Sequence, residues 1–78
     1  MRITYDPEAD ALYIQLRRGP AADAVDIEES VAVDLDGEGH IIGLEVLDAR
    51  ERLGPELNTA SYENLVLGKK AALSLPQA

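Results

Sequence analysis

Apolar and polar residues alternate within residues 1–16 with the period of β-strands. Two segments, on either side of "DPEADA", each carry an apolar side chain at every second position. An antiparallel pairing that sets Tyr5 opposite Leu12 also sets Ile3 opposite Ile14, so one face of the pair is wholly apolar. A shift by one residue would destroy that match. The pattern therefore predicts a first β-hairpin.

A second hairpin is predicted in "SVAVDLDGEGHIIGLEVLDA", residues 30–49. Apolar residues alternate on both sides of "DGEG", whose aspartate and glycines suit a tight turn. A four-residue loop made of these letters sets Leu35 opposite His40 and Val33 opposite Ile42. The inward positions on both strands are then aliphatic.

The segment between the hairpins, residues 17–30, contains a Gly-Pro pair followed by small and acidic residues. This composition predicts a connection, with a short edge strand around Ala24 to Ile27 left open.

After Leu47 the pattern changes toward a helix. "DARERL", residues 48–53, fits one helical turn that Gly54 and Pro55 interrupt, and Pro55 suits the first position of a new helix. The apolar residues that follow fit a loose helical stripe, although Gly68 weakens a single long helix by about 1 kcal/mol relative to Ala. "NLVLG" is equally compatible with a short strand. We predict a helical segment.

These elements predict a small α+β fold with an antiparallel sheet of about four strands in two hairpins and a C-terminal helical segment. Residues 1–53 form the β-hairpin domain. Residues 54–78 form a helical extension that packs on the sheet or on a partner subunit, within a single domain overall. The opposite face of the sheet carries several apolar positions, and we expect the C-terminal segment or another subunit to cover part of it. These positions are Ala11, Tyr13, Ala32, Ile41 and Leu47.

Composition points to self-association. A chain of 78 residues with 46% apolar residues and no Trp or Phe has a thin aliphatic core. It has no cysteine, which removes disulfides and thiolate metal sites, so oligomerisation is the remaining means of support. We predict a homo-oligomer with interface candidates Tyr13, Ile41, Leu47, Tyr62 and Leu65. Tyr13 fits an interface contact and cross-strand packing equally well.

The charge balance, 15 acidic residues against 7 Lys and Arg, gives a net charge of −8. Phosphate backbones repel such a chain, so we expect no direct nucleic-acid binding, whereas a basic protein partner is favoured. Neither a signal peptide nor a membrane-spanning stretch is predicted, so no membrane contact is expected and the location is expected to be cytoplasmic.

Two acidic clusters raise the question of metal or catalytic chemistry. Clustered oxygen ligands suit hard cations, but "DPEAD" also has the form of a turn, and so does "DLDGEGH". The sequence contains no nucleophile elbow, phosphate loop or dinucleotide fingerprint. We interpret both clusters as turns and expect no catalytic residue, metal ligand or cofactor. The alternatives are a metal-binding protein or small enzyme, and a self-assembling structural protein. The enzyme or metal site would use Asp6, Glu8 and Asp10, or Asp34, Asp36 and His40.

The same segments resemble a widespread family of small, mostly bacterial proteins catalogued as a domain of unknown function. The resemblance covers roughly residues 1–50 and includes the opening motif Tyr-Asp-x-x-x-Asp-x-Leu-Tyr-Ile. The matching residues are Tyr5, Asp6, Asp10, Leu12, Tyr13, Ile14, Val33, Asp34, Gly43, Glu45 and Leu47. The resemblance implies no catalytic activity, and it implies that some members are antitoxin-like partners of small ribonuclease-type toxins by gene arrangement. The leading hypothesis is a non-enzymatic, acidic protein-interaction module of this antitoxin-like kind.

Overall fold

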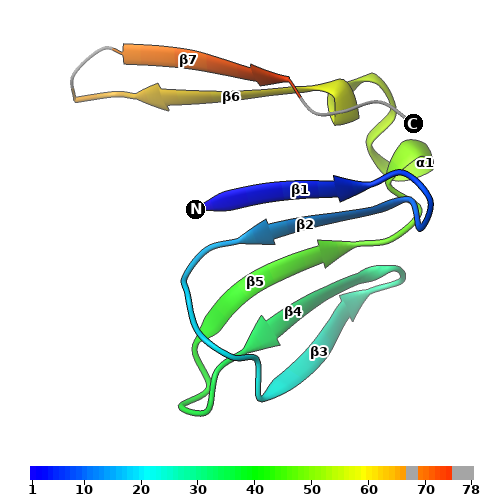
Figure 1. Cartoon of the computed structure of the whole chain (residues 1–78), viewed down its shortest axis with the longest axis vertical. Coiled ribbons are helices and arrows are strands. Elements are labelled where there is room, and N and C mark those ends of the chain that lie inside the picture. Colours follow the sequence, from blue (N-terminus) through cyan, green and yellow to red (C-terminus); the bar gives the residue numbers. More distant parts are fainter. Residues whose placement is uncertain (67–68, 75–78) are drawn as a thin grey trace.

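The computed structural model describes residues 1–66 and 69–74, which form a five-stranded antiparallel sheet, two short helical elements and a two-stranded hairpin (Figure 1). The five strands are β1 (Arg2–Asp6), β2 (Ala11–Gln15), β3 (Asp23–Glu28), β4 (Val31–Leu35) and β5 (Ile41–Val46). Their spatial order is β1-β2-β5-β4-β3, so β5 lies at the centre and joins the two predicted hairpins. The sheet has five strands instead of about four, because the acidic connection supplies β3 at one edge.

The first hairpin has the predicted register. Tyr5 pairs with Leu12 and Ile3 pairs with Ile14, and the neighbouring strand continues these apolar rows with Val46 opposite Leu12. Each strand therefore adds one side chain to the same face, which is the face that carries the core. The match of apolar rows across three strands fixes the register.

The predicted register of the second hairpin is wrong. Leu35 lies opposite Ile41 and Val33 lies opposite Leu44, with an irregularity in the pairing next to Leu35. The turn is one residue longer than expected, because the backbone N–H of Asp36 donates to the carbonyl of His40 at 2.9 Å. The Asp36 carboxylate holds this longer turn closed, since its Oδ1 accepts two backbone N–H groups of the loop.

The helical turn predicted for residues 48–53 is present as α1 (Ala49–Leu53), followed by the 3-10 helix η1 (Gly54–Asn58). Gly54 ends α1 with a φ of 56°, a backbone conformation that glycine adopts without steric cost. Pro55 lies in the first turn of η1, as predicted. Neither helix of the described part of the chain is long and apolar enough to cross a membrane.

The helix expected beyond Asn58 is absent from the described residues, so the prediction is wrong there; residues 67, 68 and 75–78 of the predicted extension lie outside the described residues. The chain instead forms an antiparallel hairpin of β6 (Thr59–Asn64) and β7 (Lys69–Ser74), and we call this hairpin, with residues 65 and 66 at its end, the arm. Ala60 and Tyr62 alternate with polar residues along β6, which is the period of a strand. Pairing with β7 satisfies the backbone of both strands, and Tyr62 lies opposite Ala71.

The core lies on the inward face of the sheet, beneath the helical turns. Tyr5, Leu12 and Val46 from three strands form one buried cluster with Ala49 of α1 and Leu57 of η1. The helical turns therefore cover the part of the inward face formed by Tyr5, Leu12 and Val46, whereas Tyr13 lies on the opposite face. The C-terminal extension accordingly contributes Leu57 to the core of the sheet domain.

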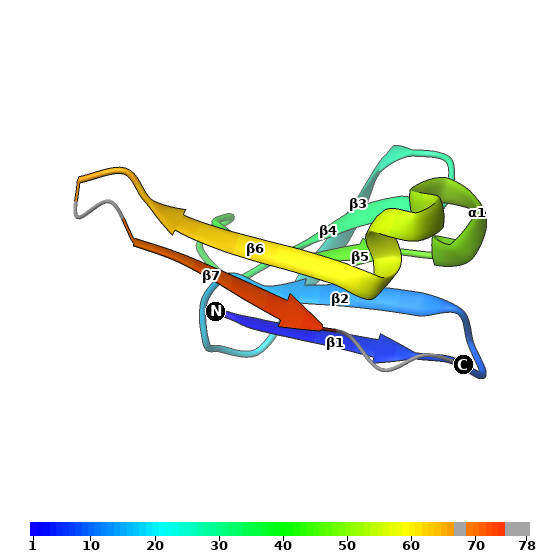
Figure 2. The same cartoon turned by 90° about the horizontal axis from the view of Figure 1, so that it is seen from above.

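The arm lies outside this core. Figure 1 places it beyond β1, and in the view from above it overlies β1 and β2 (Figure 2). Residues 59–66, 71 and 72 of the arm contain no buried side chain. The arm therefore joins the sheet domain mainly through η1, the element that its first strand contacts.

Candidate functional site

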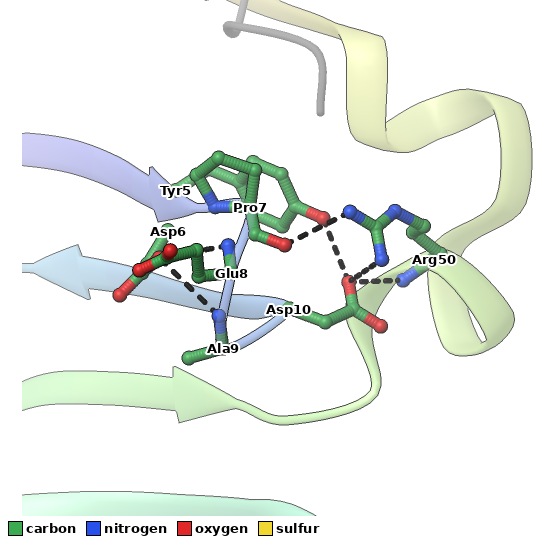
Figure 3. Close-up of polar contacts among 7 residues, drawn as sticks. All are labelled: Tyr5, Asp6, Pro7, Glu8, Ala9, Asp10 and Arg50. Carbon is green, nitrogen blue, oxygen red and sulfur yellow. Dashed lines mark hydrogen bonds and ion pairs between the residues drawn. The ribbon is translucent and has the colours of Figure 1, made fainter.

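The first acidic cluster forms the turn between β1 and β2 (Figure 3). Asp6 Oδ1 accepts hydrogen bonds from the backbone N–H groups of Glu8, at 3.0 Å, and Ala9, at 3.3 Å. This is the local side-chain bonding expected of an aspartate before proline, and it confirms the turn interpretation for Asp6. The carboxylate is therefore engaged with its own loop.

Asp10, the last acidic residue of this turn, connects the turn to α1. Its Oδ1 accepts from the Tyr5 hydroxyl at 2.7 Å and from the backbone N–H of Arg50 at 3.1 Å, although Arg50 lies 40 residues away. The guanidinium of Arg50 lies 4.0 Å from the same oxygen and donates to the carbonyl of Pro7 at 2.9 Å (Figure 3). Arg50 was missed by sequence reasoning, because nothing in the sequence indicates which distant residue meets Asp10.

These contacts also affect Tyr5. Its pKa is raised above the ordinary value of 10.0, first by burial and then by the hydrogen bond to Asp10, since both disfavour the phenolate. Asp10 itself has a φ of 51°, a left-handed conformation that aspartate tolerates better than most residues. The position thus selects for an aspartate both by conformation and by hydrogen bonding.

A second polar contact crosses the opposite face of the sheet. The Tyr13 hydroxyl of β2 donates to Asp34 Oδ2 of β4 at 2.8 Å, although β5 lies between these strands. The tyrosine side chain reaches across because position 43 on β5 is glycine. A Cβ at that position would overlap the Tyr13 hydroxyl. The structure therefore gives Tyr13 a cross-strand packing role, and its role at an interface stays a prediction.

The members of the second acidic cluster point to different partners. Asp34 bonds Tyr13, whereas Asp36 accepts from the backbone N–H groups of Glu38 and His40, each at 2.9 Å. The hydrogen bond from the His40 backbone is the main cause of a lowered Asp36 pKa. His40 is exposed, and its Nδ1 lies 3.6 Å from carboxylate oxygens of both Asp36 and Glu38.

Neither predicted acidic set gathers into a metal-binding geometry. Within residues 1–66 and 69–74, no group of three or more His, Asp or Glu side chains is arranged to hold a metal ion. The carboxylates of Asp6, Asp10, Asp34 and Asp36 are hydrogen-bonded to protein donors, and Glu8 is exposed. The arrangement favours turn formation and strand cross-linking.

The interface candidates fall into two groups. Ile41 and Leu47 are exposed at opposite ends of β5, whereas Tyr62 and Leu65 belong to the arm and its tip. Leu65 is 85% exposed, and its neighbour Val66, which sequence reasoning missed, is 94% exposed. Among the residues whose burial the structure describes, the two most exposed large apolar side chains are therefore neighbours at the end of the arm.

Comparison with known proteins shows the family to which the chain belongs. The family model DUF2283 matches residues 2–50, more than half of the chain. The chain belongs to this family. It is described as proteins of unknown function, and no curated protein or solved structure matches the chain. The DUF2283 region contains the complete five-stranded sheet and ends at Arg50, so the Asp10–Arg50 contact lies within it, whereas Leu57 and the arm lie beyond it.

Proposed function

We propose that this DUF2283 protein is a non-enzymatic, acidic protein-interaction module that assembles with itself through the arm. The observation that carries the proposal is the exposed apolar tip of a hairpin in which residues 59–66, 71 and 72 include no buried side chain. An isolated two-stranded hairpin is only marginally stable in water. A surface that covers the arm would supply the missing burial.

A second copy of the chain is the cover we propose. The side chains that need burial are Tyr62, at 56% exposure, and the more exposed Leu65 and Val66. Exposed aliphatic side chains grouped on a protruding element are typical of interaction sites. Self-association would protect the tip in every molecule without requiring a second gene product.

We propose that, besides a second copy of itself, the chain binds a basic protein, which contacts the edge strand β3. Every residue of β3 is exposed, and Asp23, Asp26 and Glu28 place three carboxylates along this edge strand. An open strand edge offers unpaired backbone groups to a partner strand, and carboxylates attract cations in the encounter. This fits the antitoxin-like role, acting in the cytoplasm, because RNA-cleaving toxins are basic.

Self-association is tested by light scattering and sedimentation of the purified chain. We expect a mass of at least two chains for the wild type and a shift toward one chain for the double variant Leu65→Ser, Val66→Ser. The matched control is Val25→Ser, Ile27→Ser, which removes two exposed aliphatic side chains from β3 and should leave the mass unchanged. A wild type that is monomeric at high concentration would contradict self-association.

The basic partner is tested by affinity capture from native extract at low and high salt. We expect the wild-type chain to retain a basic protein at low salt and to lose it at high salt. The triple variant Asp23→Asn, Asp26→Asn, Glu28→Gln should retain no basic protein at either salt concentration. Recovery of no basic protein with the wild-type chain at either salt concentration would count against this partner.

Thermal unfolding with millimolar Ca²⁺, Mg²⁺ or Zn²⁺ tests the metal alternative, which predicts a large upward shift of Tm.

A further inference from the structure

Three of the five arginines of this acidic chain surround one hollow on the surface. Arg2, Arg17 and Arg18 line an open depression of about 560 Å³ at the end of the β1–β2 hairpin, together with Met1, Gln15 and Leu16. The other two arginines are engaged: Arg50 with the β1–β2 turn, and Arg52 with Glu28 at 3.2 Å. In the described part of the chain the guanidinium groups of the three make no hydrogen bond or ion pair.

The backbone beneath this hollow is held in place. The N–H groups of Leu16 and Arg17 both donate to the carbonyl of Ile42, at 2.8 and 3.2 Å. The segment that carries Arg17 and Arg18 is therefore attached to the central strand where it leaves β2. Three exposed guanidinium groups around one depression repel one another weakly through water, and an anion bound among them would be attracted by all three.

A second hollow adjoins the first. It measures about 270 Å³, shares Arg2 and Gln15 with the first, and is further lined by Thr4 and Tyr13. Arg2 pairs with Gln15 and Thr4 pairs with Tyr13, so all four side chains lie on the same face of the sheet. The two hollows thus share Arg2 and Gln15 as a common wall, with the remaining arginines lining the first and a tyrosine lining the second.

We propose that these hollows form a binding site for a small phosphorylated molecule, with its phosphate among Arg2, Arg17 and Arg18. Guanidinium groups bind phosphate oxygens through paired N–H donors, and the Gln15 amide supplies a further donor beside them. Among the described residues, no carboxylate lines either hollow. The Asp36 pKa is lowered chiefly by the hydrogen bond from the His40 backbone and least by Arg17. Beside the second hollow, the Tyr13 hydroxyl donates to Asp34, and Glu45 lies opposite Tyr13 on β5. The organic part of the ligand lies along Thr4 and Tyr13.

The size of the site supports a small molecule of this kind. The first hollow is larger than a phosphate group requires, so part of the organic moiety fits beside the arginines. The adjoining hollow offers a tyrosine to a ring or an apolar group. The net charge of −8 disfavours anions over the remaining surface, so binding requires these convergent cations and weakens with salt.

The test is a titration followed by amide NMR shifts at fixed ionic strength, with inorganic phosphate, phenyl phosphate and phenol as probes. We expect saturable shifts of Arg2, Gln15 and Arg18 with both phosphates, tighter binding of phenyl phosphate, and little response to phenol. The double variant Arg2→Gln, Arg18→Gln should bind at least tenfold more weakly. The matched control Arg52→Gln removes one positive charge elsewhere and should stay within about twofold of the wild type.

Three outcomes would overturn the proposal. Shifts that do not saturate, or that sodium chloride reproduces, would show only general ionic screening. Unchanged affinity in the Arg2→Gln, Arg18→Gln variant, with its fold verified by the same spectra, would remove the arginines from the site. Equal affinity for inorganic phosphate and phenyl phosphate would remove Tyr13 and the second hollow from it.

Discussion

At the scale of single residues, Asp10 shows how an acidic side chain in this chain acts as a structural connector. One oxygen accepts from the Tyr5 hydroxyl and from the Arg50 backbone, and the Asp10 carbonyl accepts from the N–H of Ala49 at 3.1 Å. A carboxylate that satisfies donors from the first hairpin and from α1 holds these two parts together. The acidic motif is therefore explained by folding.

We predict that Asp10→Ala lowers the free energy of unfolding by about 2 kcal/mol or more. It removes hydrogen bonds to a charged acceptor and places alanine at a positive φ. Urea unfolding measures the effect, with Glu8→Ala as control, because Glu8 is an exposed residue of the same turn. Equal stabilities of the two variants would show that the Asp10 contacts contribute nothing.

The position of the Tyr13 side chain depends on Gly43, because the tyrosine passes over the glycine to reach Asp34. We predict that Gly43→Ala costs about 1–3 kcal/mol, because the added methyl group displaces the Tyr13 side chain. In a Tyr13→Ala background the same substitution should cost much less. A double-mutant cycle by urea unfolding measures this coupling. Additive effects would contradict the overlap.

The Tyr13 hydroxyl also predicts an alkaline dependence of stability. Its hydrogen bond to Asp34, and then its partial burial, raise its pKa above the ordinary value of 10.0. A group whose pKa is raised by folding stabilises the fold fully below its unfolded pKa and loses that contribution as the pH rises through the folded value. We expect stability to fall above about pH 10, and to fall less in Tyr13→Phe, by urea unfolding between pH 8 and 11. The same decline in both proteins would exclude Tyr13 as its source.

At the scale of elements, η1 completes the core from outside the DUF2283 region. Leu57 is only 5% exposed and packs with Tyr5, Leu12 and Val46, which belong to three different strands. The left-handed Gly54 and the following Pro55 turn the chain back so that Leu57 meets the sheet. A five-residue 3-10 helix thus covers one end of the inward face.

We predict that Leu57→Ala lowers the free energy of unfolding by about 2–4 kcal/mol, because it leaves a cavity in a thin core. The control is Leu47→Ala, which removes the same atoms from a side chain that is 41% exposed and should cost well under half as much. Thermal or urea unfolding gives both values. A larger effect at Leu47 would place the main core on the other face.

At the scale of the whole molecule, the sheet domain and the arm differ in the burial of their side chains. The buried core residues Tyr5, Leu12, Val33, Ile42, Val46, Ala49 and Leu57 all precede the arm, which starts at Thr59. The sheet domain therefore has its own core, whereas residues 59–66, 71 and 72 of the arm contain no buried side chain. This division is the physical basis for assigning self-association to the arm.

We predict that a chain ending at Asn58 unfolds cooperatively and is monomeric, while a chain ending at Leu53, which lacks Leu57, is much less stable. Circular dichroism during heating, with sedimentation of both chains, tests this expectation. If the chain ending at Asn58 did not fold, the arm would have to contribute to the core of the sheet domain.

The sequence by itself determined the first hairpin, the presence of the second, the helical turn after Leu47 and the turn role of Asp6. These depend on interactions between residues close in sequence, namely period-2 apolar matching and side chains that bond their own turn. Both the alternation of apolar residues in a strand and the turn-forming residues can be recognised within a few residues of sequence. The five-stranded order could not be read in this way, because pairing of β2 with β5 depends on the whole set of apolar faces.

Only the tertiary structure decided what the distant residues do. The five-residue turn at Asp36, the Asp10–Arg50 contact and the Tyr13–Asp34 bond over Gly43 each join residues whose proximity follows from strand order and not from spacing. The grouping of Arg2 with Arg17 and Arg18 follows from the same pairing of β1 with β2. For the arm, a weak helical stripe and a strand period compete in one segment. Backbone pairing between β6 and β7 decides the outcome, because it satisfies the hydrogen bonds of both strands at once.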